Sequence, residues 1–199
     1  MKMRGLLLAF EGLDQSGKQT QAESLRDYFV SKGRECRLLS FPDYTTPIGR
    51  EISRALHGER EYAPDTLQLL YIANRYEHRA AIQSMIDAEI VVICDRYAAS
   101  SIAYGEAQGL DAGWLADAQR FLPAADLTIV LDIAPETAVG RKATGRDRYE
   151  RDLALLSGVR DSYHRQSAQP NWIRLDGGRS KSDVTADVLT AVATRLGQP

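Results

Sequence analysis

Residues 6–20, Leu-Leu-Leu-Ala-Phe-Glu-Gly-Leu-Asp-Gln-Ser-Gly-Lys-Gln-Thr, decide the fold. They place the spacing Gly-x-x-x-x-Gly-Lys directly after an apolar run and directly before a helical pattern. In such a loop, backbone N–H groups and the start of the following helix surround nucleotide phosphates, and the lysine reaches the β and γ oxygens. We therefore expect a P-loop whose ATP contacts are Gly12, Leu13, Asp14, Gln15, Ser16, Gly17, Lys18, Gln19 and Thr20.

Around this loop, short apolar runs alternate with longer segments of helical periodicity. The expected strands cover residues 6–10, 37–40, 90–94, 127–131 and 172–175, and the expected helices cover residues 17–31, 47–56, 64–87, 98–107, 111–121, 135–142, 151–167 and 182–196. Strands that are apolar on both sides are typical of a sheet covered on both faces, and the alternation predicts parallel strands. The expected fold is α/β, a three-layer P-loop NTPase fold with a five-stranded parallel sheet flanked by helices. We expect one domain over residues 1–199, into which the polar, basic segment at about 140–150 is inserted as a small mobile lid.

Composition limits the partners. A net charge of −2 with 26% charged residues argues against a broad polyanion-binding surface, so we expect a small-molecule partner and no nucleic acid. The first apolar run ends at Glu11-Gly12, too early for a signal peptide or a membrane segment. A cytoplasmic protein without a membrane partner is the expectation.

The metal site departs from the usual P-loop pattern, because Gln19 stands where a serine or threonine normally binds Mg²⁺. The Gln19 amide oxygen, a water that it holds, or the Thr20 hydroxyl after a one-residue slip are the alternatives. The strand over residues 90–94 ends in Asp95-Arg96, at the sheet edge where ligands bind in open α/β folds. There Asp95 can support Mg²⁺ directly or through water, and the planar fork of Arg96 can clamp a phosphate.

The same place carries a family resemblance. Asp95-Arg96-Tyr97-Ala-Ala-Ser100-Ser101-Ile-Ala-Tyr104 resembles the characteristic motif of thymidylate kinases. Further segments resemble that family in the same order along almost the whole chain: Phe10 to Gln21, Phe41-Pro42-Asp-Tyr44, Ala73-Asn74-Arg75 and Arg148-Tyr149-Glu150. The resemblance implies a homodimeric kinase that uses ATP and Mg²⁺ to convert dTMP to dTDP.

For the acceptor, the resemblance implies a role for each matching residue. Arg75 lies near the thymine base, Arg96 on its phosphate and Ser101 at the edge of the base. The ring of Tyr104 lies against the deoxyribose, and Asp14 lies near the 3′-hydroxyl and the metal. Tyr71 is four residues before Arg75, hence on the same helix face, where a ring and a guanidinium can frame a planar base. The expected acceptor site is completed by Phe41, Tyr44, Ser100 and Tyr149.

Catalysis by phosphoryl transfer depends on alignment and on positive charge around the transferring group. In the resembling family a cation comes from the P-loop or from the lid, and here only Gln15 and Ser16 lie between Asp14 and Gly17. The lid must therefore supply it, and the candidates are Arg141, Lys142, Arg146 and Arg148, of which Arg141 is also expected near the adenine. The predicted catalytic set is Lys18, Asp14, Arg96, Arg146 and Arg148.

Two alternatives stay open. The acceptor can be another one of the same chemistry, such as dUMP, UMP, CMP or a nucleoside. In a different class, the chain is a regulatory P-loop ATPase that hydrolyses ATP without an acceptor and has no use for Arg75 and Arg96.

Overall fold

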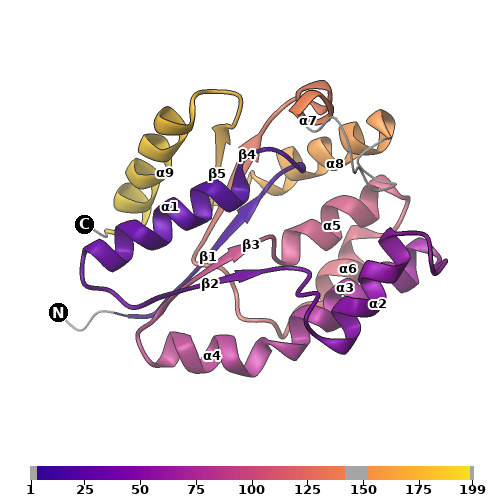
Figure 1. Ribbon diagram of the computed structural model, residues 1–199, viewed down its shortest axis with the longest axis horizontal. Helices are drawn as coiled ribbons and strands as arrows, with labels where there is room; N and C mark the ends of the chain where they lie inside the picture. The colour runs from indigo at the N-terminus through magenta and orange to yellow at the C-terminus, as the bar shows by residue number, and fades with distance from the viewer. Residues whose placement is uncertain (1–3, 142–151, 198–199) are drawn as a thin grey trace.

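The computed structural model describes residues 4–141 and 152–197. Five strands form one parallel sheet in the order β2-β3-β1-β4-β5 (Figure 1). The strands are β1 (Leu6–Glu11), β2 (Cys36–Ser40), β3 (Val91–Asp95), β4 (Leu127–Asp132) and β5 (Trp172–Asp176). The expected five-stranded parallel sheet is confirmed, with strand ends that differ from the expected ones by a residue.

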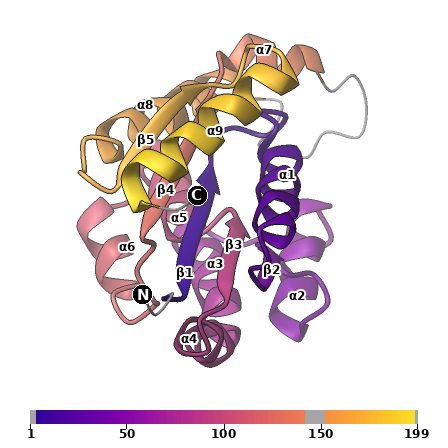
Figure 2. The same cartoon turned by 90° about the vertical axis from the view of Figure 1, so that its left-hand side faces the viewer.

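Helices cover both faces of this sheet (Figures 1 and 2). On one face lie α1 (Lys18–Ser31) and α9 (Lys181–Leu196), which share a core cluster with the strands. On the other face lie α4 (Arg79–Asp87), α5 (Ala98–Ala107) and α8 (Leu153–Gln166). The remaining helices are α2 (Pro47–Leu56), α3 (Pro64–Glu77), α6 (Ala112–Ala118) and α7 (Pro135–Arg141). Helices α3 and α6 pack against α5, and α2 packs against α3, so these three helices lie outside the layer that covers the sheet.

The central strand β1 shows why the sequence folds into this arrangement. Successive side chains of a strand point to opposite faces, so an apolar run buries both sides of a sheet only when both are covered. Leu6, Leu8 and Phe10 pack in the cluster with α1 and α9, whereas Leu7 and Ala9 pack in the cluster with α4. Every one of these side chains is at most 1% exposed, so β1 sits in the middle of the core.

The single helix expected over residues 64–87 is wrong, because the chain forms two helices that meet at His78. The ring of His78 packs edge-on against Phe41 with centroids 5.4 Å apart, and its Nε2 lies 3.1 Å from Asp43 Oδ2. These contacts with the loop after β2 hold the turn between α3 and α4. As a result α3 packs on α5, while α4 packs on β3.

All five strands end at the same edge of the sheet, and this edge positions the candidate site. Ligands of open α/β sheets bind at the carboxyl ends of strands where the strand order reverses. Here β1 leads into the P-loop, β2 into Phe41, and β3 into Asp95 and Arg96. In the described ranges, none of the helices has the length and apolar character needed to cross a membrane.

Candidate active site

The P-loop links β1 to α1 through a backbone that requires glycine at its first position. Gly12 has φ +132°, and a Cβ atom there would lie 2.4 Å from the carbonyl oxygen of Leu131 on β4. Gly17 is the N-terminal cap of α1 with φ +95°. Gln15 also has a positive φ, +63°, which is strained for a residue with a side chain and is typical of ligand-binding loops. The local sequence therefore produces a tight loop ahead of a helix start.

Lys18 is the buried cation of this loop. Its side chain is 6% exposed, and Nζ donates a hydrogen bond of 2.8 Å to the carbonyl oxygen of Leu13. Burial, helped by the nearby positive charge of Arg96, lowers the pKa of Lys18 to about 8. An anion beside Nζ favours the charged ammonium, so this lysine is suited to hold phosphate oxygens.

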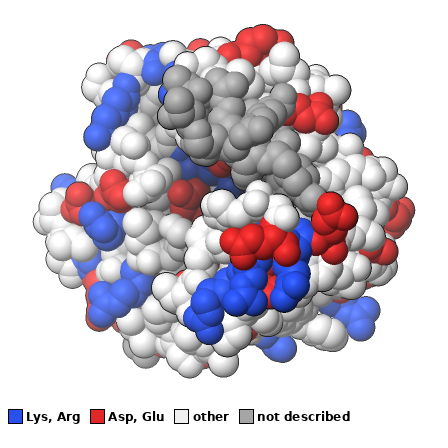
Figure 3. All heavy atoms as spheres, turned by 45° about the vertical axis from the view of Figure 1, so that its right-hand side comes forward, with Lys and Arg blue, Asp and Glu red and all other residues white. Residues whose placement is uncertain are grey.

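One cavity of about 290 Å³ brings the P-loop together with residues from two other strands. Its lining includes Asp14, Gln15, Gly17, Lys18, Gln19, Thr20, Ser40, Phe41, Asp95 and Arg96. The expected donor loop and the expected acceptor arginine thus share one space. On the face shown in Figure 3, basic and acidic side chains lie beside one another rather than in an extended patch of one sign.

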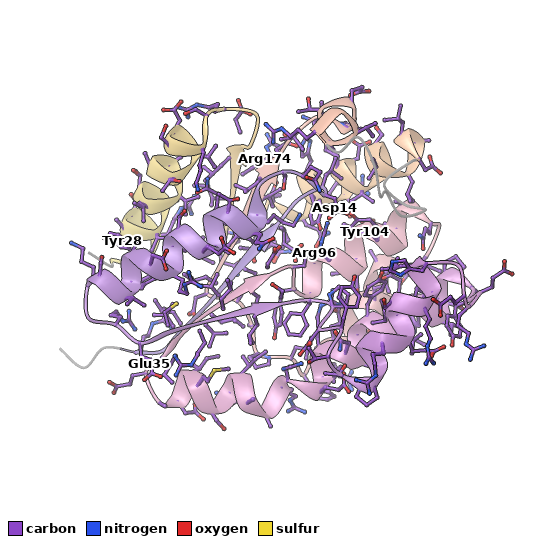
Figure 4. All side chains as sticks on the ribbon, viewed as in Figure 1. Asp14, Tyr28, Glu35, Arg96, Tyr104 and Arg174 are labelled. Carbon is purple, nitrogen blue, oxygen red and sulfur yellow. The ribbon has the colours of Figure 1, made fainter. Side chains whose placement is uncertain are left out.

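Arg96 is held in a strained conformation at the edge of this cavity. Its φ is +64°, and its backbone N–H donates 2.9 Å to the carbonyl oxygen of Phe10. One guanidinium nitrogen lies 2.7 Å from Asp14 Oδ1 and 3.3 Å from the hydroxyl of Tyr104, whose ring lies under the guanidinium (Figure 4). Burial opposes the charge of Arg96, but the neighbouring Asp14 carboxylate raises its pKa well above the ordinary value. The guanidinium is therefore charged at every physiological pH.

A second arginine, Arg75 on α3, is buried at 2% exposure. It donates 2.7 Å to the Ser101 hydroxyl and 3.4 Å to Gln119 Oε1. Burial lowers its pKa. Tyr71 is half-buried one turn earlier on the same helix, as the spacing predicted. Gln119 was not predicted from the sequence, because no local motif marks it.

Two buried oxygen atoms fit the needs of a Mg²⁺ ion. Asp95 Oδ1 and Ser16 Oγ are buried, and no residue of the described part of the chain gives either of them a hydrogen bond. Oxygen ligands suit Mg²⁺, which usually takes one or two protein carboxylates together with substrate phosphates. Within residues 4–141 and 152–197 no cluster of three or more His, Cys, Asp or Glu side chains forms a metal cage. The Gln19 amide nitrogen donates 3.0 Å to Glu23 on the exposed side of α1.

The other expected site residues occupy different surroundings. Arg141, at the end of α7, donates to the carbonyl oxygens of Gln15 and Gly177 at 3.0 and 3.1 Å, so it joins the P-loop to the turn after β5. Phe41 is buried beside Tyr97, and Tyr44 is 47% exposed. The predicted lid and acceptor residues Lys142, Arg146, Arg148 and Tyr149 lie outside the described residues.

Two residues that sequence reasoning missed lie directly behind Arg96. Glu11 ends β1 with no exposed surface, and Tyr163 on α8 is 1% exposed. Their side chains form a 2.9 Å hydrogen bond, and both contact the Ser100 hydroxyl. A charged residue that ends an apolar strand is a signal in the sequence, because buried charges are costly unless they have partners. Tyr163 offers no such signal, because an aromatic side chain on a helix face is typical of ordinary core packing.

Comparison with known proteins assigns the family. A model of the thymidylate kinase family matches residues 10–188. The chain belongs to the thymidylate kinase family. It is 34% identical to a thymidylate kinase of Plasmodium falciparum (isolate 3D7) over 199 residues, which is 100% of this chain and 94% of that protein. It is 35% identical to the thymidylate kinase of Schizosaccharomyces pombe, covering 96% of this chain and 92% of the relative.

Solved structures agree with this assignment. The thymidylate kinase of Candida albicans superposes with a TM-score of 0.83 at 30% identity, covering 98% of this chain and 93% of that one. The two thymidylate kinase family members therefore share one fold over nearly the whole length of each chain.

Proposed function

We propose that this protein transfers the γ-phosphoryl group of ATP to dTMP and so forms dTDP and ADP. The single observation that carries the proposal is the shared cavity, in which the strained Arg96 faces the P-loop residues Gly17 and Lys18. A donor loop alone supports only nucleotide binding, whereas a partly buried arginine that lines the same cavity supports an anionic acceptor.

In this mechanism an oxygen of the acceptor phosphate attacks the γ-phosphorus, and ADP leaves in line. The P-loop N–H groups and Lys18 hold the β and γ oxygens, and Arg96 offers the acceptor phosphate the guanidinium nitrogen that here contacts Asp14. Phosphoryl transfer needs little covalent help, so the main contributions of these residues are alignment and charge.

The residues proposed for the acceptor base and sugar come from α3, from α5 and from the P-loop. Arg75 and Ser101, which are already hydrogen-bonded, approach the edge of thymine, and the Tyr71 ring covers its face. The ring of Tyr104 excludes a 2′-hydroxyl, and Asp14 approaches the 3′-hydroxyl. Phe41, Tyr44, Ser100 and Tyr149 complete the proposed acceptor site.

Mg²⁺ is part of the proposal, and when bound it would neutralise negative charge on the phosphates. Asp95 would hold it, with Ser16 beside it, and Gln19 would contribute only after leaving Glu23. The lid proposed at about residues 140–150 would bring Arg146 and Arg148 to the transferring group, within one kinase domain over residues 1–199. The family resemblance supports a homodimer, and the net charge of −2 supports a protein that binds no nucleic acid. A cytoplasmic location without a membrane partner completes the proposal.

The test is an acceptor panel with ATP and Mg²⁺, scored by ADP formation: dTMP, dUMP, UMP, CMP, thymidine and no acceptor. The Candida albicans relative has a broad substrate specificity, so a wide panel is needed. We expect dTMP to give the highest kcat/KM and ADP release to require an acceptor. A preference for UMP would contradict the Tyr104 argument, and acceptor-independent hydrolysis would favour the regulatory ATPase.

Lys18→Ala belongs in the same assay, because it removes the cation of the P-loop. We expect turnover to fall by on the order of 10³-fold or more, with an unchanged circular dichroism spectrum. Lys32→Ala is the matched control, since Lys32 follows the same helix and is exposed. Retained turnover in Lys18→Ala would remove the P-loop from the mechanism.

A further inference from the structure

Behind Arg96 lies a buried carboxylate that the proposed mechanism does not use. Glu11 Oε1 accepts hydrogen bonds from the backbone N–H groups of Tyr97, at 2.8 Å, and Ser100, at 3.3 Å. Glu11 Oε2 accepts from the hydroxyls of Ser100, at 2.6 Å, and Tyr163, at 2.9 Å. Glu11 has no exposed surface, so these protein groups, and not solvent, satisfy its carboxylate.

The hydrogen bonds run in one direction, from Arg96 to Glu11. A guanidinium has donors only, so Arg96 Nη1 donates to the oxygens of Ser100, at 3.2 Å, and Tyr163, at 3.4 Å. Each hydroxyl thereby accepts from the arginine and keeps its own hydrogen for the carboxylate. Glu11 thus fixes the orientation of both hydroxyls with their oxygens toward Arg96.

The same strand end also holds the backbone of Arg96. The Phe10 carbonyl accepts from the Arg96 N–H. The Glu11 carboxylate accepts from the N–H of the following residue, Tyr97, at the start of α5. A residue with φ of +64° costs free energy relative to ordinary backbone, so neighbouring contacts must maintain it. Phe10 and Glu11 supply these contacts from two successive positions of β1.

We propose that Glu11 is a positioning residue for the acceptor phosphate: through Ser100 and Tyr163 it fixes the direction in which Arg96 presents its guanidinium. The inference rests on the proposed function, because it assigns Arg96 to the phosphate of dTMP. Glu11 itself touches neither substrate nor metal. Tyr163 lies on α8, so through this network it links that helix to the site.

The experiment compares two ligands that differ only in the group that Arg96 would bind. Binding of dTMP and of thymidine, the latter as a competitive inhibitor, is measured for the wild type, Glu11→Gln, Tyr163→Phe and the double variant. A glutamine has one acceptor oxygen, so either the α5 N–H groups or the two hydroxyls lose their partner. Tyr163→Phe removes only the relay to Arg96 and leaves the helix start intact.

We expect Glu11→Gln to weaken dTMP binding by on the order of tenfold or more while thymidine binding changes less than about twofold. Tyr163→Phe should act in the same direction by roughly threefold to tenfold, the effect of one hydrogen bond. Since both act through Arg96, the double variant should not exceed Glu11→Gln by a further full Tyr163→Phe effect. Tyr97→Phe is the matched control, because its buried hydroxyl donates to the Pro123 carbonyl, away from Arg96.

Equal weakening of dTMP and thymidine, or no weakening of either, would overturn the positioning role and leave Glu11 as a structural residue. If Glu11→Gln does not fold, Tyr163→Phe decides alone, since it keeps the carboxylate and its contacts with α5. Failure of the proposed function is a separate result: the wild type would then not phosphorylate dTMP at all, whatever the variants do.

Discussion

Two arginine–aspartate pairs in this protein have the same closest distance but different surroundings. Arg96 and Asp14 approach to 2.7 Å in the cavity, and Arg160 and Asp132 approach to 2.7 Å between α8 and the end of β4. Arg160 uses two nitrogens on one carboxylate, with a second contact of 3.0 Å, and sits within a regular helix. Arg96 gives Asp14 one nitrogen and has φ +64°.

The difference shows that an ion pair by itself does not mark a functional residue. The Arg160 pair satisfies the carboxylate of Asp132 together with His164, at 3.0 Å, and joins a helix to a strand. The Arg96 pair combines a strained backbone, hydroxyls aimed at the guanidinium and a cavity beside a P-loop. Strain that the surrounding structure maintains is found mostly where the side chain has a task besides stability.

The largest expected difference between the two pairs is the effect on turnover of removing each arginine. Arg96→Ala should lower kcat/KM for dTMP by about 10²- to 10³-fold, because a preorganised charge at the acceptor phosphate is lost, while the affinity for an ATP analogue stays within about threefold. Arg160→Ala is the matched control and should keep kcat/KM within about threefold. Steady-state kinetics and nucleotide binding measure both. A large loss of turnover in Arg160→Ala would mean that the Asp132 pair also serves the site.

The Asp132 pair should instead appear in stability, and with a defined pH dependence. Burial opposes ionisation of Asp132, but hydrogen bonds from Arg160 and His164 lower its pKa overall. A carboxyl whose pKa is lowered on folding stabilises the protein above its unfolded pKa of about 3.9 and loses that effect as the pH falls through the folded value. At pH 7, Asp132→Asn should therefore reduce the free energy of unfolding by about 1 to 2 kcal/mol.

Urea unfolding of the wild type and Asp132→Asn across acid pH checks this prediction. The difference between the two proteins should shrink as the pH falls below about 4, because the unfolded wild-type carboxyl takes up a proton first and the folded one only at lower pH. Asp161→Asn, an exposed position on the same helix, should change stability by less than about 0.5 kcal/mol. A difference that is constant with pH would assign the loss to packing rather than to charge.

The sequence predicted the fold well because the three central strands β1, β3 and β4 are apolar on both sides and are bounded by polar residues. Leu6 to Phe10 and Leu127 to Leu131 are buried on both sheet faces, so no other periodicity competes with a buried strand. The break at His78 could not be predicted, because the helical pattern continues through it. Its cause is Asp43 and Phe41, which are distant in the sequence and come together only in the fold.

The site was predictable where its residues are local. Gly12 to Lys18 are consecutive residues of one loop and the helix start after it, whereas Asp95 ends β3 and Arg96 follows it at the binding edge of the sheet. The support behind them was not predictable, because Tyr163 lies on α8 and Gln119 lies just after α6. A glutamine or a tyrosine on an apolar helix face has the same local pattern whether it supports a site or only fills the core.

The backbone strain allows the smallest but most specific test of the comparison. An L-residue costs about 1 kcal/mol more than glycine in the left-handed region, whereas glycine inside a helix costs about 1 kcal/mol more than alanine. Arg96→Gly should thus be about 1 kcal/mol more stable than Arg96→Ala, although both lose turnover equally. At Arg160, inside α8, the order should reverse, with Arg160→Ala the more stable by a similar amount. The four variants are compared by urea unfolding at pH 7. At each position both variants lack the arginine side chain, so they differ only in how well glycine and alanine tolerate the backbone conformation. The same order at both positions would mean that Arg96 is not held in a strained conformation, and the case for it as a residue retained at a cost in stability would fail.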